Sequence, residues 1–297
     1  MIDTAGELKR PVAQALADFV ERRWKPLTFV GIIILLFGVS VLLANQVNTG
    51  SFMPRAFELT GGKQIEIVLV AEPDMSVVKS ALPDVSAKLI GGAQPILVIE
   101  APLAANETQI LAKLADKGIS GESSVRTIGP VLGEVFWKQT QTAIIVAFAL
   151  MSVVIFVLFR KLAPSVAIVT AAMTDAVFAL AMLSMLGEQL SLPVLAGVLM
   201  LIGYSVDSNI VLTTELLRSP GKEVPQCFRA AAKTGLTLTV AALAALGAMY
   251  VISGSLVIRQ IAGVLIIGLL ADIPATWLTN AGILRWYLKR KRKAVNE

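Results

Sequence analysis

Three acidic residues fall inside long apolar stretches of this sequence: Asp175, Asp207 and Asp272. An ionised carboxylate is costly in hydrocarbon, so an acid within a membrane span is by default a candidate functional residue. A carboxyl group that can gain and lose a proton at mid-membrane could carry protons. Lys233, at the mouth of a predicted span, is the candidate counter-ion for Asp207. These four residues are the predicted proton- or ion-coupling residues.

The neighbours of Asp207 are small or polar. Gly203 lies four residues before it, and Ser205, Ser208 and Asn209 flank it. Such residues allow helices to approach closely and to share hydrogen bonds. The last two predicted spans add further polar groups: Thr234, Thr237, Thr239, Thr276, Thr279 and Asn280. The pattern predicts a polar seam through a helical bundle.

The four charged residues differ in what the sequence favours for them. A functional role is favoured for Asp207, because it has so many polar neighbours. For Asp175 and Asp272, function and purely structural hydrogen bonding remain equally open. Lys233 is better explained by snorkelling, in which a long side chain extends its charge to the membrane interface.

The composition identifies the class of protein. Of 297 residues, 56% are hydrophobic, and the mean hydropathy is +0.75. A soluble domain is about 45–50% apolar. The excess lies in long runs, which indicates an integral membrane protein embedded in the lipid bilayer. The net charge of +5 comes from basic residues beside these runs, so it argues for membrane orientation and against nucleic acid.

Several kinds of chemistry are excluded by the residue types. The chain has no histidine, which removes imidazole-based catalysis and metal binding, and its single cysteine, Cys227, allows no intrachain disulfide or thiolate cluster. We therefore expect no cofactor, no metal and no enzymatic activity.

Six spans are predicted, each near the roughly 20 residues that a crossing helix needs: 27–45, 139–159, 164–186, 193–217, 235–253 and 260–284. Lys and Arg cluster in the leader, in the turn at 160–161, after the fourth span and in the tail. All of these fall on one side if both termini are cytoplasmic. The predicted location is the cell membrane, with a leader at 1–26 that is either a surface-bound amphipathic helix or a partly ordered tail, and a basic cytoplasmic tail at 285–297.

The segment 46–138 is predicted to form a domain outside the membrane. Its pattern reads strand, helix, strand, strand, helix, strand, with Asp74 and Asn106 as helix N-caps and Gly118 as a helix stop. This order is the split βαβ arrangement of ferredoxin-like α+β domains. The predicted fold class is thus a bundle of six transmembrane helices with a ferredoxin-like domain between helices 1 and 2.

Four segments carry a family resemblance, in the order and spacing of that family: FELTGG (57–62), IGPVLG (128–133), the stretch 174–212 that contains IGYSVDSN, and DIPATWLTNAGIL (272–284). The chain resembles the SecD/SecF family of protein-export membrane proteins, relatives of resistance-nodulation-division transporters. The Gly-Tyr-Ser sequence within IGYSVDSN resembles the SecF branch of this family. The single six-span chain resembles the archaeal form, in which SecF is not fused to SecD. Two departures from bacterial SecF are the acid at Asp207, one residue earlier, and Lys233 in place of an arginine.

The resemblance implies a function in protein export. It implies work with a SecD-like subunit beside the Sec translocon channel, on unfolded preproteins, driven by the proton-motive force. Asp207 would then couple the bundle to the outside domain. Two alternatives remain: half of a proton-coupled small-molecule transporter of the same superfamily, or a passive scaffold of the translocon.

Overall fold

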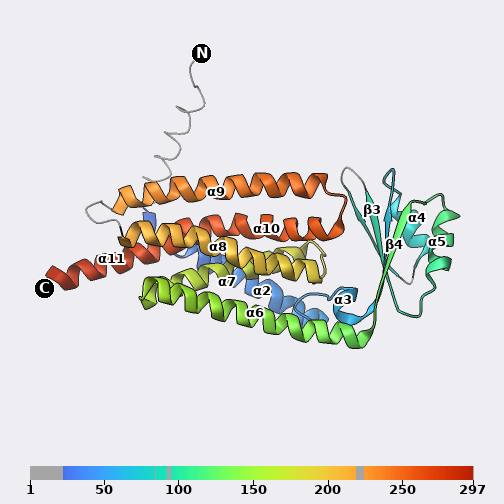
Figure 1. The fold of residues 1–297 in the computed structure, drawn as a ribbon, viewed down its shortest axis with the longest axis horizontal. Coiled ribbons are helices and arrows are strands. Elements are labelled where there is room, and N and C mark those ends of the chain that lie inside the picture. The colour runs from blue at the N-terminus through green and yellow to red at the C-terminus, as the bar shows by residue number, and fades with distance from the viewer. Residues whose placement is uncertain (1–22, 84, 92–94, 219–223, 297) are drawn as a thin grey trace, which may run out of the picture.

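The computed structural model describes residues 23–83, 85–91, 95–218 and 224–296. Within them, a bundle of long helices carries a four-stranded sheet at one end (Figure 1). Six helical segments are long and apolar enough to cross a membrane: Arg23–Thr49, Pro130–Phe159, Leu162–Met185, Leu192–Leu217, Val224–Ile252 and Leu256–Arg290. The predicted number of spans is confirmed, and each segment extends past its predicted bounds at one or both ends. Most of the predicted leader, residues 1–22, lies outside the described residues.

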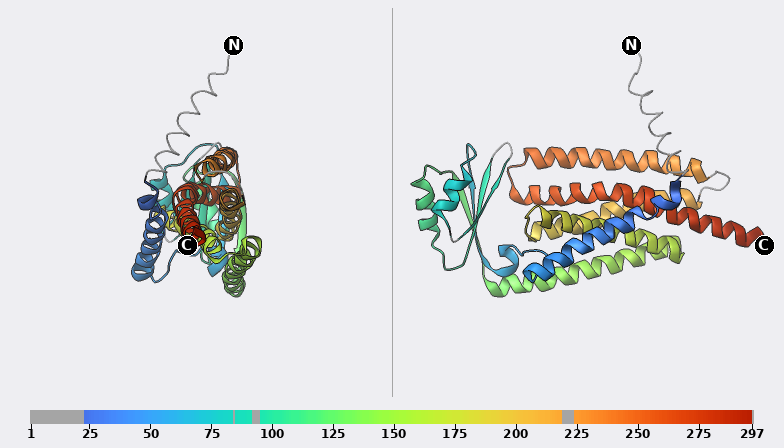
Figure 2. Two further views of the ribbon diagram at one scale, coloured as in Figure 1. Left: turned by 90° about the vertical axis from the view of Figure 1, so that its left-hand side faces the viewer. Right: turned by 180° about the vertical axis from the view of Figure 1, so that it is seen from behind.

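The bundle has central and peripheral helices. Its helices are α2 (Val30–Thr49), α6 (Pro130–Phe159), α7 (Leu162–Met185), α8 (Leu192–Arg218), α9 (Val224–Ile252), α10 (Leu256–Pro274) and α11 (Ala281–Asn296). The main apolar core joins α7, α8 and α10 through side chains such as Ala179, Leu201 and Leu265. Seen from behind, α2 lies across the bundle and α11 extends beyond it at the end opposite the sheet (Figure 2).

The last span changes its helical geometry near the middle. Pro274 ends α10 and is followed by a π-helical segment, η1 (Ala275–Asn280), before α11 begins. Proline has no backbone N–H and its ring crowds the carbonyl one turn earlier, so the ordinary hydrogen-bond ladder cannot continue through it. Single π-helical turns of this kind occur often at functional sites. Here η1 carries Thr276, Thr279 and Asn280, all buried.

The sheet segment contains β1 (Gly62–Val68), α4 (Met75–Ala81), β2 (Ser86–Ile90), β3 (Ile96–Ala101), α5 (Glu107–Ala115) and β4 (Glu122–Ile128), in the predicted order of strands and helices. The strands pair antiparallel in the order β2-β3-β1-β4. The predicted caps are also confirmed. Asp74 and Asn106 accept hydrogen bonds from the backbone N–H groups of Ser76 and Thr108, and Gly118 follows α5 with φ +75°.

The two faces of the sheet differ because side chains alternate along a strand. Ile65 and Ile67 of β1 and Leu97 and Ile99 of β3 point toward α4 and α5 and form a core with them. The alternate residues point toward the bundle, where Ile96 and Val98 pack on Leu256 of α10. Ile90 of β2 packs with them, and the face also carries polar side chains.

Backbone hydrogen bonds join the sheet segment to the bundle. The chain entering α3 (Phe57–Thr60) runs beside the α7–α8 connection: Ala56 N donates to Leu190 O at 3.0 Å, and Leu190 N donates to Pro54 O at 2.7 Å. Two of the family-like segments also meet. Gly61, with φ +83°, packs so closely on Pro130 that a Cβ would lie 2.6 Å from the Pro130 Cα. Glycine is therefore required at this turn.

Candidate functional site: a carboxyl pair inside the bundle and an exposed acid outside it

Two of the three predicted acids meet inside the bundle. Asp175 of α7 and Asp272 of α10 are both 0% exposed. Ser205 of α8 lies between them: its Oγ is 2.5 Å from Asp175 Oδ2 and 3.2 Å from Asp272 Oδ1. Three helices that are distant in sequence therefore contribute to one polar centre, as the predicted seam requires.

Asp272 has more hydroxyl contacts than Asp175. Ser208 Oγ donates to Asp272 Oδ2 at 2.8 Å, and Thr276 Oγ1 donates to Asp272 Oδ1 at 2.7 Å. Ser205 is the hydroxyl that contacts Asp175. The π-helical segment is therefore part of the site, because it presents Thr276 to the carboxylate one turn before it.

The seam continues through two asparagines. Asn280 Nδ2 donates to Asn209 Oδ1 at 2.5 Å, and Asn209 Nδ2 donates to the backbone carbonyl of Ser205 at 2.7 Å. Thr279 turns away from the seam and accepts a hydrogen bond from the backbone N–H of Gly31 on α2 at 2.7 Å. The polar line thus runs along α8 against α10 and η1.

Asp207 does not belong to this seam, contrary to the prediction. Its side chain is exposed, whereas Ser205, Ser208 and Asn209 are buried. At 3.6 residues per turn, Asp207 lies about 200° around the helix from Ser205, so the two point in opposite directions. Residues that flank Asp207 in the sequence point to other sides of the helix. Polar neighbours in the sequence therefore do not place Asp207 on the polar face of α8.

Gly203 lies on the same outer face as Asp207, and the prediction that it supports the seam is also wrong. A Cβ built on Gly203 meets nothing within 4 Å. The outer face of α8 carries a stripe of exposed residues at helical spacing: Ala196, Met200, Gly203 and Asp207. The glycines that do allow close helix packing are elsewhere, such as Gly268 of α10 against Leu201 of α8.

The predicted polar groups of the fifth span do not reach the seam. Lys233 is exposed, and the described structure contains no ion pair between it and Asp207. Thr234, Thr237 and Thr239 each donate to the backbone carbonyl four residues earlier in α9.

Among the described residues, no group of three or more His, Cys, Asp or Glu side chains is placed to hold a metal ion.

A comparison with protein-family models identifies the family of this chain. The model of the C-terminal part of the protein export membrane protein SecD/SecF matches residues 109–290, more than half of the sequence. The chain belongs to the SecD/SecF family of protein-export membrane proteins. The resemblance predicted from four sequence segments is confirmed.

Relatives in this family are similar over nearly the whole chain. A protein-export membrane protein SecF from Pyrococcus furiosus is 35% identical over 290 residues, which cover 96% of this chain and 98% of that protein. Another from Methanothermobacter thermautotrophicus is 34% identical and covers 92% and 96% of the two chains. The crystal structure of SecDF from Thermus thermophilus, a translocon-associated membrane protein, shares the fold with TM-score 0.70 at 19% identity. The match covers 89% of this chain and 38% of the SecDF chain.

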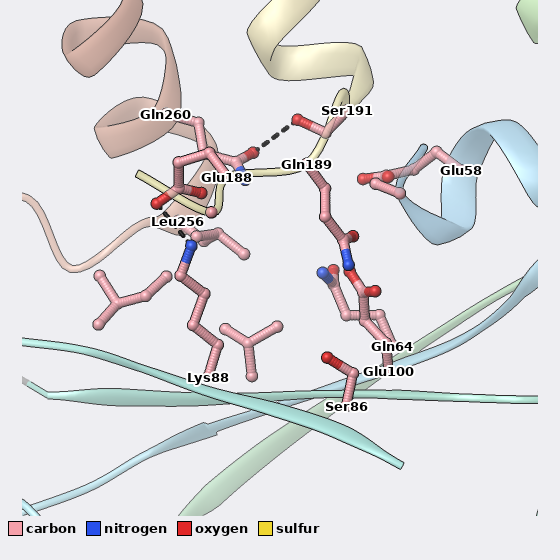
Figure 3. Close-up of a pocket in the computed structure, with 14 residues that line it drawn as sticks. Glu58, Gln64, Ser86, Lys88, Glu100, Glu188, Gln189, Ser191, Leu256 and Gln260 are labelled. Carbon is pink, nitrogen blue, oxygen red and sulfur yellow. Dashed lines mark hydrogen bonds and ion pairs between the residues drawn. The ribbon is translucent and has the colours of Figure 1, made fainter. Parts of the chain in front are cut away.

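One polar site of this SecD/SecF family member has no counterpart in the sequence predictions. It lies between the inner face of the sheet and the bundle, and Glu58, Gln64, Glu100 and Gln189 line it (Figure 3). Alternation along β1 and β3 would have placed Gln64 and Glu100 on one face. Only the docking of that face against α3 and the α7–α8 connection makes it an interior.

Proposed function

We propose that this chain is an auxiliary subunit of the Sec protein-export machinery, which promotes movement of unfolded preproteins across the cell membrane together with a SecD-like subunit. Full-length similarity to proteins named protein-export membrane protein SecF supports this proposal. The SecDF structural relative, whose chain is more than twice as long, supports a two-part assembly of which this chain is one part.

The orientation proposal rests on the distribution of basic residues. The α6–α7 turn at Arg160 and Lys161 and the basic helix α11 lie at the end of the bundle opposite the sheet (Figure 1). Basic residues favour the cytoplasmic side. Both termini would therefore be cytoplasmic, and the sheet segment would lie outside the membrane. We further propose that this segment is ferredoxin-like, which its β-α-β-β-α-β order and β2-β3-β1-β4 sheet support.

The proposed mechanism of ion coupling depends on the exposed position of Asp207. An acid exposed on a span would face lipid in the isolated chain, and such exposure is costly. Gly203, one turn before Asp207, leaves open space on this face where another helix can approach. We propose that the SecD-like subunit covers this face, and that the Asp207 carboxyl group at the resulting interface responds to protons.

The buried carboxyl pair would supply a second proton-responsive element. Two full negative charges this close, with no ion pair to either of them among the described residues, would repel strongly. The pair therefore would hold a proton, and the larger number of hydroxyl donors favours negative charge on Asp272. Gain or loss of that proton would bias the packing of α7 against α10 between two states and thereby move the outer domain. The proton-motive force would drive the cycle.

The test is secretion in cells that carry Asp207→Asn in place of the native copy. We expect export to fall while membrane abundance and co-purification of the SecD-like subunit stay normal. Asp207→Glu, which keeps the carboxyl group, is the matched control. Loss of the complex with normal export per assembled complex would favour the scaffold alternative. Normal export at normal abundance would contradict the coupling role of Asp207.

A further inference from the structure

A polar pocket of about 80 Å³ lies where the sheet meets the bundle (Figure 3). A single water needs only about 10–15 Å³ of such space. The pocket therefore has room for an ion together with water. Its walls come from four parts of the chain: α3, the sheet, the α7–α8 connection and the first turns of α10.

The sheet register builds one wall. Gln64 of β1 and Glu100 of β3 are directly opposite each other in the antiparallel pairing, and Ser86 of β2 is opposite Glu100 on the other side. Residues that pair directly lie on the same face of a sheet. These three side chains therefore form a row that faces the bundle. Gln189 from the α7–α8 connection points toward this row, and Glu58 from α3 extends into the space between the row and the bundle (Figure 3).

Three buried oxygens in the pocket lack a hydrogen-bond donor among the described residues: Glu58 Oε2, Gln64 Oε1 and Gln189 Oε1. Glu58 is 7% exposed and Gln64 is 4% exposed, so bulk water hardly reaches them. A buried acceptor without a partner is unfavourable, and native structures seldom leave several together. Three such acceptors facing one space need a partner within it, which is either a hydrogen-bond donor such as water or a cation.

The charges in the pocket leave two carboxylates to be balanced. Lys88 and Glu188 form an ion pair at 2.6 Å and so compensate each other. Burial raises the pKa of Glu58 and of Glu100, and the charge of Glu100 raises that of Glu58 further. The side chain of Gln189 and the charge of Lys88 lower the pKa of Glu100 by less than burial raises it, and Arg126, directly opposite Gln64 on β4, is already paired with Glu66. Each carboxylate therefore carries a desolvation cost that a bound cation would remove.

The oxygen atoms that face the pocket indicate which cation it binds. They belong to carboxylates and amides, with no sulfur and no imidazole nitrogen among them, and such ligands suit hard ions rather than transition metals. Two carboxylates for which burial outweighs the nearby positive charges match one divalent charge. Calcium accepts irregular sets of six to eight oxygens, including amide carbonyls and water, whereas magnesium requires a nearly ideal octahedron.

We propose that this pocket binds one calcium ion through the carboxylates of Glu58 and Glu100 and the amide oxygens of Gln64 and Gln189. Water would complete the coordination. Because Gln64 and Glu100 belong to the sheet while Glu58 and Gln189 belong to the membrane-side elements, the ion holds the sheet against the bundle. The site is independent of Asp207 and of the proposed export cycle, so either can fail without the other.

The test is calcium binding to the full chain, purified in detergent and stripped with a chelator, measured by calorimetry with calcium chloride as the probe. We expect about one ion per chain with a dissociation constant on the order of 10⁻⁴–10⁻³ M, as in extracellular modules. Glu58→Gln and Glu100→Gln each weaken binding about tenfold or more, because each removes one ligand charge. Glu122→Gln, an exposed acid on β4 outside the pocket, binds like the native chain.

A variant that is expected to bind calcium more tightly controls for misfolding of the two Glu→Gln variants. Gln189→Glu adds a third carboxylate at the same length and is expected to tighten calcium binding severalfold. Circular dichroism checks that each variant is folded. The proposal is overturned if the folded native chain binds no calcium at several millimolar, or if Glu58→Gln and Glu100→Gln bind it like the native chain. The proposal would equally be overturned if sodium chloride stabilised the folded chain more than potassium chloride did while calcium chloride had no effect.

Discussion

Asp175 on α7 and Asp272 on α10 are joined through a single hydroxyl group, that of Ser205 on α8. The contact joins three helices at a point where both carboxyl groups and the hydroxyl group are fully buried. The same residue also receives, on its backbone carbonyl, the amide of Asn209. Ser205 therefore occupies the structural centre of the seam.

Replacing Ser205 with alanine should destabilise the bundle. The substitution removes the donor to Asp175 and leaves that carboxyl group without its hydroxyl contact. Side-chain hydrogen bonds between membrane helices contribute about 1 kcal/mol, which is the expected loss in the free energy of unfolding. Unfolding in detergent measures it. Ser40→Ala is the matched control, because the exposed Ser40 hydroxyl bonds only a carbonyl of its own helix. Equal effects of both substitutions would refute the central role of Ser205.

Gly235→Ala should weaken the packing of α9 on the last span. A Cβ at this position would lie 2.3 Å from Cζ2 of Trp277, a buried ring that also packs edge-on against Phe228. Overpacking of this kind costs about 1–3 kcal/mol. The measurement is the thermal unfolding midpoint in detergent. Gly247→Ala on the same helix meets nothing within 4 Å and should leave the midpoint unchanged or raise it. A native-like midpoint for Gly235→Ala would show that Trp277 moves freely.

The stability of the chain without divalent ions should fall as pH rises from acid toward neutral. Burial raises the pKa of Glu58 and Glu100 in the folded chain above the unfolded value of about 4.3. A raised carboxyl pKa means that the folded state holds the proton more tightly. The stabilisation is therefore complete below about pH 4, and it is lost as pH rises through the raised pKa values.

The Glu58→Gln/Glu100→Gln double variant tests this pH dependence. Its two amides stay neutral, so its unfolding free energy should vary less with pH over that window than the native value does. Denaturant unfolding at a series of pH values provides the comparison, with Glu122→Gln as the control. Identical pH profiles for the native chain and the double variant would show that these two carboxyl groups do not titrate differently on folding.

Arg259 should hold the end of β2 to the bundle. Its Nε donates to Ser253 O at 2.7 Å, and its Nη1 donates to the carbonyls of Ile90, at 3.4 Å, and Gly91. Hydrogen bonds from a charged group contribute about 1.5–3 kcal/mol. In Arg259→Gln we expect amide hydrogen exchange in β2 to accelerate roughly tenfold or more.

The matched control for Arg259→Gln is Lys113→Gln, which removes an exposed positive charge from α5, away from the junction. Exchange in β2 should be native-like in this variant. If both variants exchange alike, Arg259 does not restrain the strand.

The sequence by itself determined the elements that local chemistry controls. Apolar runs of sufficient length specify the six spans, because a helix satisfies its own backbone hydrogen bonds in hydrocarbon. Alternation and capping residues specify the strands and helices of the sheet segment, and Asp74 and Asn106 act as caps because their partners lie two residues away. The family-like segments likewise identified the family.

Only the tertiary structure decided which polar residues meet. Asp207 and Ser205 are two residues apart in sequence but face opposite sides of α8, whereas Asp175 and Asp272 are distant in sequence and share one hydroxyl. The rotation of each helix about its axis is set by packing against its neighbours, which a single helix sequence does not specify. The junction pocket follows the same rule, since Glu58 and Glu100 lie in one interior only after the sheet docks on the bundle.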